Sequence, residues 1–166
     1  MNNEIIQKAL NDKFGAAIIG FEEQYGMLTI NINAASVLEI LNFLNKDATL
    51  AFCFLTDITA VHYPDKTNQE LCVVYHLHNL VANKRIRLKA FIPIAQPQIP
   101  SVTPLYSSAN WMERETYDFF GVQFLGHPNL VRILTVDEMN YFPLRKEYPM
   151  EDPTRIDKDD HMFGRV

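Results

Sequence analysis

The first part of the chain shows a change in the spacing of its apolar side chains. Residues 3–14 place them at helical spacing, which predicts a short amphipathic helix that ends near Gly15. Residues 16–21 and 27–32 are instead short β-like runs, AAIIGF and MLTINI. The glycine of EEQYG, which lies between these two runs, suits the loop of a β-hairpin.

A second helix and three further strands are predicted next. Asn33 can cap a helix over residues 34–46, whose apolar side chains form one stripe. Strands are expected at residues 50–63, 69–80 and 84–92, with PDKTN and VANK as their turns. The order helix, two strands, helix, three strands predicts an α+β fold. We expect a two-layer sandwich with helices packed on a mixed, largely antiparallel sheet of about five strands.

The second half of the chain is richer in proline. IPIAQPQIPSVTP contains four prolines and predicts a rigid connection, followed by a helix over residues 105–120. After Gly121, prolines interrupt every candidate element, so about 45 residues are expected to be mostly irregular. We therefore expect three parts: a sandwich domain over residues 1–100, an interface helix over 101–121 and an extended C-terminal arm over 122–166. Aromatic side chains recur along this arm, which favours docking on a partner over a disordered tail.

Composition and charge limit the classes of function. With 166 residues, 48% of them hydrophobic and 21% charged, the chain has the composition of a compact globular domain. Its 15 lysines and arginines are outnumbered by 20 aspartates and glutamates and form no long basic run, which argues against a nucleic-acid partner. The first residues are too polar for a signal peptide, and no apolar run approaches the ~20 residues of a bilayer span. Any membrane association is therefore expected to be indirect, through partners.

The two cysteines restrict the cofactors that the chain can hold. Cys53 and Cys72 show no Cys-x-x-Cys spacing, which suits a reducing compartment, and an iron-sulfur cluster needs about four thiolates. Cys72, His76 and His78 would share one face of a strand and could bind zinc, although no fourth ligand has motif-like spacing. A free-standing metalloenzyme is therefore an alternative. Two partly exposed histidines beside a core cysteine are the simpler interpretation.

Conventional catalytic patterns are missing from the sequence. There is no GxGxxG, P-loop, GxSxG or HExxH motif. On a helix, Glu113 and Glu115 fall on nearly opposite sides, so they are poorly placed as a general acid and base. His127, in a Gly-His-Pro turn, is expected to be a turn residue.

The charged side chains of the predicted helix need partners of their own. Arg114 and Asp118 are four residues apart and can pair along the helix. Glu115 falls between two aromatic side chains, where a carboxylate needs a partner, and Arg132 or Arg145 is expected to supply it. Because aromatic side chains occur on every side of the helix, we expect it to be covered by the arm or by another protein.

The stretch ERETYDFFGVQFLGHPNLVRIL, followed by PLRKEYP, resembles the signature of the 30 kDa subunit family of respiratory complex I, NADH:quinone oxidoreductase, whose bacterial members are its C subunits. The resemblance joins Glu-Arg-Glu-x-Tyr-Asp-x-Phe-Gly, Gly-His-Pro and Pro-Leu-Arg-Lys-Glu-Tyr-Pro in this order, and it extends from about residue 30 to residue 150. The chain departs from the family pattern at Val131, where another arginine is frequent. It departs again at Tyr141 and Phe142, which replace a dipeptide that usually contains glycine.

The resemblance implies a non-catalytic, hydrophilic subunit of the peripheral arm, in its quinone module. FMN and iron-sulfur clusters would be held by partner subunits, with quinone as the substrate of the complex and no cofactor in this chain. The implied partners are the D subunit and the neighbouring B and I subunits, at the cytoplasmic side of a bacterial inner membrane. An equivalent subunit of a membrane-bound hydrogenase or another complex I-like enzyme is the alternative.

The resemblance also indicates which residues fix the arm and its docking, and it implies chemistry at none of them. These interface residues are Glu113, Arg114, Glu115, Tyr117, Asp118, Gly121, His127, Pro128, Arg132, Leu144, Arg145, Lys146, Tyr148 and Pro149.

Overall fold

The structure, a computed structural model, describes residues 2–149. Its largest element is a five-stranded sheet with the strand order β1-β2-β5-β4-β3. The strands are β1 (Ile18–Gln24), β2 (Met27–Ile32), β3 (Phe54–His62), β4 (Leu71–Asn79) and β5 (Lys84–Ile92). β2 and β5 run parallel, whereas all other neighbouring strands of this sheet are antiparallel. The predicted α+β class with a mixed, largely antiparallel sheet is therefore confirmed.

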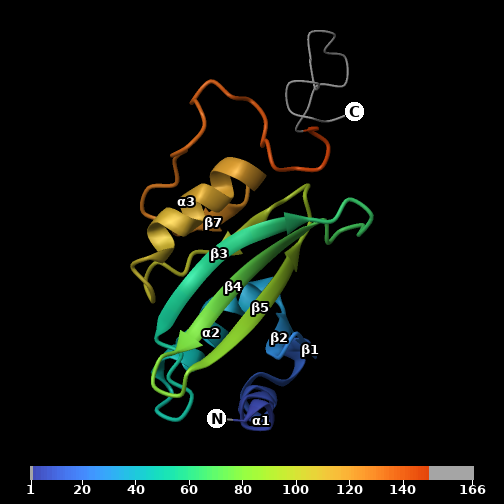
Figure 1. The fold of residues 1–166 in the computed structure, drawn as a ribbon. Coiled ribbons are helices and arrows are strands. Elements are labelled where there is room, and N and C mark those ends of the chain that lie inside the picture. Colours follow the sequence, from blue (N-terminus) through green and yellow to red (C-terminus); the bar gives the residue numbers. More distant parts are fainter. Residues whose placement is uncertain (1, 150–166) are drawn as a thin grey trace, which may run out of the picture.

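Two helices, α1 (Asn3–Phe14) and α2 (Val37–Lys46), form the second layer (Figure 1). Their apolar stripes are fully buried, through Ile6 and Leu10 of α1 and through Val37, Ile40, Leu41 and Leu44 of α2. The strands supply the other half of the same core with alternate side chains, such as Ile86, Leu88 and Ala90 of β5. The core therefore lies on the face of the sheet that α2 covers.

Local chemistry explains the turns that connect these elements. The side chain of Asn33 accepts a hydrogen bond of 3.0 Å from the amide of Ala35. Asn33 thus caps the 3-10 turn before α2, whereas α2 itself has Ser36 at its N-cap, without a side-chain cap bond. This 3-10 turn spans Ala34–Ser36, so α2 begins three residues later than the predicted helix. A second 3-10 turn (Gly15–Ala17) leads from α1 to β1, and the β1–β2 hairpin is closed by Tyr25 and Gly26.

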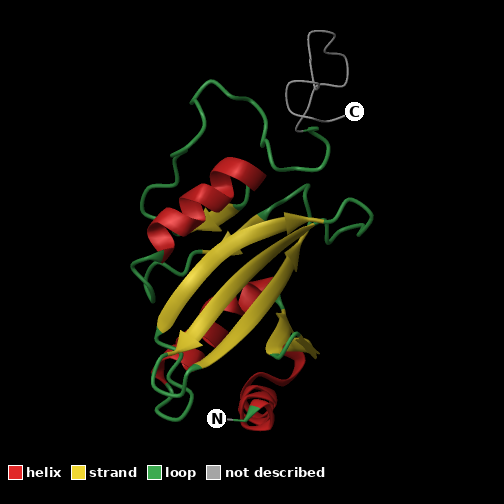
Figure 2. Cartoon of the chain, in the orientation of Figure 1, coloured by secondary structure: helices red, strands yellow, loops and turns green. Residues whose placement is uncertain are grey.

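The second half of the chain continues the fold along the edge strand β3. Helix α3 (Ala109–Phe120) lies beside β3, where Thr116 Oγ1 is 3.3 Å from the carbonyl oxygen of Ile58. Covering the free edge of a sheet in this way blocks pairing with other chains. Two short strands, β6 (Gln98–Pro100) and β7 (Gln123–Leu125), pair in parallel next to α3 (Figure 2).

One expectation for this half, the start of the helix, was wrong in detail. The helix begins at Ala109 and not at residue 105, because the preceding residues form turns, with Leu105 and Tyr106 amides bonded to the carbonyl of Val102. The hydroxyl of Tyr106 holds these turns against the sandwich through a bond of 2.9 Å to the carbonyl of Phe52. The segment after Gly121 was expected to be mostly irregular, and up to residue 149 its one regular element is the three-residue strand β7, which pairs with β6.

Beyond β7 the arm crosses over α3 and returns toward β3 (Figure 1). The last part of the predicted arm, residues 150–166, lies outside the described residues. Over residues 2–149, no helix has the length and apolar character needed to span a bilayer.

Candidate docking site of helix α3 and the C-terminal arm

Helix α3 ends at a glycine that the arm covers closely. Gly121 has a left-handed backbone with φ of 77°. Its amide donates a hydrogen bond of 2.8 Å to the carbonyl of Tyr117. A β-carbon built at Gly121 would lie 2.5 Å from the ring of Phe142 and 2.6 Å from Nη2 of Arg145. Gly121 therefore meets two demands, a backbone conformation that glycine adopts most easily and a close approach of the arm.

Asp118 is the carboxylate to which the arm is tied. Its side chain is fully buried, and Oδ1 lies 2.8 Å from Nη1 of Arg132. Oδ2 accepts hydrogen bonds of 2.8 to 3.0 Å from three successive amides, those of Ile133, Leu134 and Thr135. The hydroxyl of Thr135 also donates to Oδ1. Burial by itself would raise the pKa of this carboxyl, but the hydrogen bonds from Thr135 and from the amides hold the pKa well below its usual value.

The expected pairing of Asp118 with Arg114 was therefore wrong. Arg114 instead donates to backbone carbonyls of the arm, from Nε to Val131 at 3.1 Å and from Nη2 to Arg132 at 3.4 Å. Arg114 and Asp118, which were predicted to pair with each other, both bind the arm instead. A buried carboxylate with amide donors is stabilised far more than an exposed pair along a helix.

The expectation for Glu115 was also wrong, because Glu113 is the buried glutamate. Glu115 is exposed, whereas Glu113 has no exposed surface. Glu113 Oε2 accepts 2.7 Å from the hydroxyl of Ser101, and Oε1 accepts 2.7 Å from the amide of Val102. Burial raises the pKa of Glu113 to about 7, although these two hydrogen bonds act in the opposite direction. Glu113 thus fastens α3 to the segment that follows β6.

Arg132 and Arg145 both lie close to the Phe142 ring. The guanidinium carbon of Arg132 lies 5.2 Å from the ring centroid, and that of Arg145 lies 4.6 Å from it. Arg132 Nη2 also donates to the carbonyls of Met139 and Tyr141, at 2.9 and 3.2 Å. Arg145 Nε donates 2.8 Å to the carbonyl of Phe120, at the end of α3. The two arginines therefore hold the arm as a loop against the C-terminal end of the helix.

His127 orders the turn between β7 and the arm. Its Nδ1 accepts 3.0 Å from the amide of Asn129, so the ring proton is on Nε2, which lies 3.1 Å from the carbonyl of Asn110. The prediction of a turn residue is in agreement with this geometry. Pro128 follows it in the exposed part of the turn.

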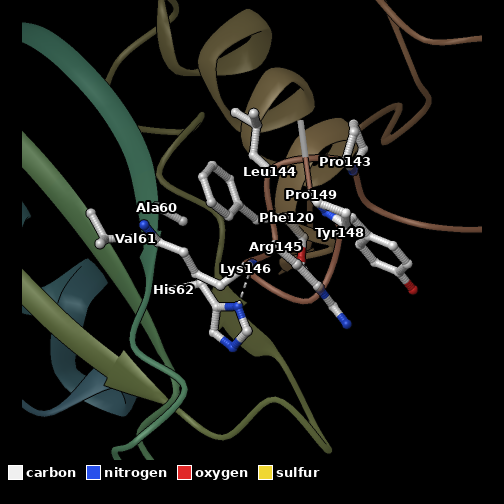
Figure 3. A pocket seen from close by; sticks show the side chains of 10 residues that line it. All are labelled: Ala60, Val61, His62, Phe120, Pro143, Leu144, Arg145, Lys146, Tyr148 and Pro149. Atoms are coloured by element: carbon white, nitrogen blue, oxygen red, sulfur yellow. Dashed lines mark hydrogen bonds between the residues drawn. The ribbon is translucent and has the colours of Figure 1, made fainter. Parts of the chain in front are cut away.

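The returning arm and β3 enclose a cavity of 460 Å³ (Figure 3). Its walls are mostly apolar and are formed by Ala60, Val61, His62, Phe120, Pro143, Leu144, Arg145, Lys146, Tyr148 and Pro149. The amide of Lys146 donates 3.0 Å to Nδ1 of His62, which closes one side of the cavity. Four of the predicted interface residues of the arm besides Arg145 therefore lie here: Leu144, Lys146, Tyr148 and Pro149.

Comparison with known proteins identifies the family of the chain. Residues 30–154 match the model of the family described as respiratory-chain NADH dehydrogenase, 30 kDa subunit. The chain belongs to this family. It is 43% identical to the C subunit of NADH-quinone oxidoreductase from Citrifermentans bemidjiense over 154 residues, which cover 93% of each chain. Membership makes it a subunit of an enzyme complex, NADH-quinone oxidoreductase, and confirms the resemblance drawn from the sequence.

Two solved structures share the fold of this 30 kDa subunit family member. A trypsin-resistant fragment of Nqo5 superposes with a TM-score of 0.65 at 30% identity, over 75% of this chain and 98% of that one. A chain of the membrane-bound sulfane sulfur reductase, an archaeal respiratory membrane complex, superposes with a TM-score of 0.75 at 27% identity. That match covers 89% of this chain and 85% of the other.

The two departures from the family pattern occupy different positions in the site. Phe142 is central to it, because its ring contacts both arginines and lies 6.1 Å from the ring of Tyr117. Val131 is exposed and takes part through its backbone: its carbonyl accepts from Arg114, and its amide donates to the carbonyl of Asn129. The side chain of Val131 thus lies at the surface of the arm, whereas that of Phe142 fills the space above Gly121.

The alternative of a zinc site has no structural support in this 30 kDa subunit family member. Burial raises the pKa of the Cys72 thiol to about 12, which opposes the thiolate that zinc requires. His76 accepts from Nε of Arg87 at 3.0 Å, and His78 lies 3.2 Å from Oδ1 of Asn83. Throughout residues 2–149, no three His, Cys, Asp or Glu side chains gather closely enough to hold a metal ion.

Several residues of the site were not expected from the sequence. Ser101, Thr135, Phe142 and His62 each bind a predicted residue, but none carries a local motif. The bonds of Ser101 and Thr135 cross 12 and 17 residues, and that of His62 crosses 84. Two of them lay near a signal, since Ser101 falls within the proline-rich segment and Phe142 stands at a departure from the family pattern.

Proposed function

We propose that this chain is a non-catalytic docking subunit of the peripheral arm of NADH:quinone oxidoreductase, and that α3 with the C-terminal arm forms its docking site. The partner subunits would be D, with B and I as neighbours, on the cytoplasmic side of a bacterial inner membrane. Those partners would hold FMN and the iron-sulfur clusters and carry electrons to quinone. The chain would reach the membrane only through the complex.

The state of the charged groups in the site supports a role without chemistry. Glu113 and Asp118 are fully buried, and their oxygens are engaged by donors of the chain itself. A general acid or base must reach a reacting atom of the substrate. These two carboxylates instead fix the position of α3 and of the arm.

The outer surface of the same region exposes several large apolar side chains, and this observation carries the proposal. Trp111 of α3 has 63% of its surface exposed. Tryptophan is among the residues that contribute most to protein interfaces, so its exposure here indicates a contact with a partner. The arm exposes further large apolar side chains, namely Val131, Leu134, Val136, Tyr141, Leu144 and Tyr148. Such a surface over an internally bonded loop fits a partner protein. The loop is held by Arg132 and Asp118, so it can present these side chains without first becoming ordered.

Two kinds of variant test the proposal in the assembled complex. Arg145→Ala removes the bond to Phe120 and should reduce assembly and quinone reductase activity together. Trp111→Ala combined with Leu134→Glu alters only exposed side chains and should reduce assembly without changing the unfolding of the purified chain. Lys46→Ala, at the exposed end of α2, is the matched control and should leave both unchanged. Normal assembly with lost activity in either variant would indicate a direct catalytic role and would contradict the proposal.

A second candidate is the equivalent subunit of a related respiratory membrane complex. The superposition on a chain of the archaeal sulfane sulfur reductase favours it as an alternative. Purification of the native complex decides between the two. A flavin-containing subunit that oxidises NADH should copurify with this chain, and its absence from an otherwise intact complex would favour the second candidate.

A further inference from the structure

The face of the sheet opposite α2 carries a row of positive charge. Along β5, buried Ile86 and Leu88 alternate with Arg85, Arg87 and Lys89, which point to this opposite face. The sheet register places His78 beside Arg85 and His76 beside Arg87. We call the surface formed by the three charged side chains Arg85, Arg87 and Lys89, together with the neighbouring His76 and His78, the cationic face. No helix of residues 2–149 covers it, and Figure 2 shows the three strands β3, β4 and β5 open to the viewer there.

The charges of the cationic face are not neutralised by the rest of the described chain. In residues 2–149, neither Arg85 nor Lys89 forms an ion pair. Their direct neighbours on β4 are His78 and Val74, and carboxylates occur only at the margins, as Asp57 on β3 and Glu22 on β1. The whole chain has a net charge of −5, so a cationic row at the centre of an open sheet runs against the average charge of the protein.

Arg87 is held in a fixed orientation across the sheet. Its Nε donates 3.0 Å to Nε2 of His76 on β4, and its Nη2 lies 3.6 Å from the sulfur of Met27 on β2. His76 is positioned in turn by Asp57, whose Oδ2 lies 3.8 Å from Nδ1 of His76. The guanidinium therefore bridges neighbouring strands and keeps further N–H donors for a ligand. A charge that is already ordered loses little conformational entropy on binding.

Exposed apolar side chains border the same face at one end of the sheet. The β1–β2 turn and the β4–β5 turn lie next to each other, because Tyr25 and Asn83 line one pocket. Tyr25 is 104% exposed and has a φ of 55°, an unusual conformation for a bulky residue, and Val81 is 100% exposed. Leu80 and Phe54 add to this apolar end. Aromatic anchors beside arginines are typical of protein interfaces.

We propose that the cationic face is a second docking surface, which binds an acidic segment of another subunit of the complex. Such a segment has the opposite charge to Arg85 and Lys89, which form no ion pair within residues 2–149. The apolar end of the face can bind an anchor residue of the same segment. The inference rests on the proposed function, because it assumes that the chain works within an assembly. A nucleic acid is disfavoured, since the row is short and the chain as a whole repels a polyanion. The surface is separate from α3 and the arm.

Photo-crosslinking in the native complex tests the proposal directly. Arg85 is replaced by the photoreactive residue benzoylphenylalanine, and the irradiated complex is digested and analysed by mass spectrometry. The expected product joins this position to a segment of another subunit in which Asp and Glu outnumber Lys and Arg. The proposal would be overturned if the peptide that carries the photoreactive residue were recovered without a cross-link. It would also be overturned if that peptide were joined to a phospholipid, a nucleic acid, a basic segment or this chain itself. The same substitution at Lys46 on α2 is the position control.

Charge reversal provides a second measurement. We measure the KCl concentration at which half of the bound subunit is released from the complex. The double variant Arg85→Glu with Lys89→Glu should lower this concentration about twofold or more. The control variant Lys8→Glu with Lys46→Glu changes the net charge by the same amount, at exposed positions of α1 and α2. It should leave the KCl concentration for half-release unchanged. Equal release from both variants would overturn the proposal, provided that both purified chains unfold at the same temperature. Failure of the unaltered chain to copurify with any complex would instead refute the proposed function.

Discussion

Asp118 of α3 and Arg132 of the arm form a buried ion pair, with 2.8 Å between Oδ1 and Nη1. The carboxylate is completely buried and the arginine nearly so. A buried pair of this kind is tolerated because other groups satisfy both partners, here the amides of the arm and the carbonyls of Met139 and Tyr141. The pair therefore holds residues 132–135 of the arm against helix α3.

Replacing Asp118 with Asn should release the arm. The substitution leaves Arg132 buried without a counter-charge, which costs about 3 kcal/mol. We expect faster trypsin cleavage after Arg132 and Arg145 and a lower free energy of unfolding, measured with urea and circular dichroism. Asp137→Asn, at an exposed position of the arm, is the control. Unchanged cleavage would show that the pair does not hold the arm.

Replacing Gly121 with Ala should displace Phe142 and Arg145 from the end of α3. The new β-carbon would meet the Phe142 ring at 2.5 Å, and the left-handed backbone adds a cost of about 1 kcal/mol. Gly126→Ala is a matched control, because Gly126 has a φ of 84° but nothing within 4 Å of an added β-carbon. The difference in unfolding free energy between the two variants measures the close approach of the arm. Equal destabilisation would mean that backbone strain accounts for the whole effect.

The buried Glu113 should make the chain less stable as the pH rises. Burial raises its pKa from 4.5 to about 7, so the unfolded chain releases this proton more readily than the folded chain does. The contribution to stability is therefore complete below pH 4.5 and is lost as the pH rises through 7. Unfolding free energies measured from pH 5 to 8 should fall in the natural chain and change less in Glu113→Gln. Glu115→Gln, on the exposed side of α3, should retain the full pH dependence.

The two cysteines should differ in reactivity. Cys53 is exposed, whereas Cys72 is buried and its pKa is raised to about 12 by that burial. Iodoacetamide at pH 8 should therefore modify Cys53 first, with Cys72 protected until the sheet unfolds. Mass spectrometry of the peptides gives both rates. Rapid modification of Cys72 in the folded chain would contradict its place in the structure.

The strands and helices of the sandwich could be predicted because their signals are local. The run KRIRLKAFI alternates in period two, and β5 spans the predicted residues 84–92. MLTINI likewise forms β2 over the predicted residues 27–32. The start of α3 was placed four residues too early, because Tyr106 is drawn to the carbonyl of Phe52, a contact that the local pattern does not contain.

The sequence by itself determined the class of fold, the family and the separation of Glu113 from Glu115 on a helix. Each of these depends on residues close together in the chain or on the order of motifs, and both can be read from the sequence without knowledge of the folded structure. Only the tertiary structure decided which glutamate is buried and that Asp118 binds Arg132 and not Arg114. Helix periodicity defines opposite sides of α3 but not which side meets the sheet. That choice depends on Ser101, Thr135 and Arg132, which are distant along the chain and approach α3 only after folding.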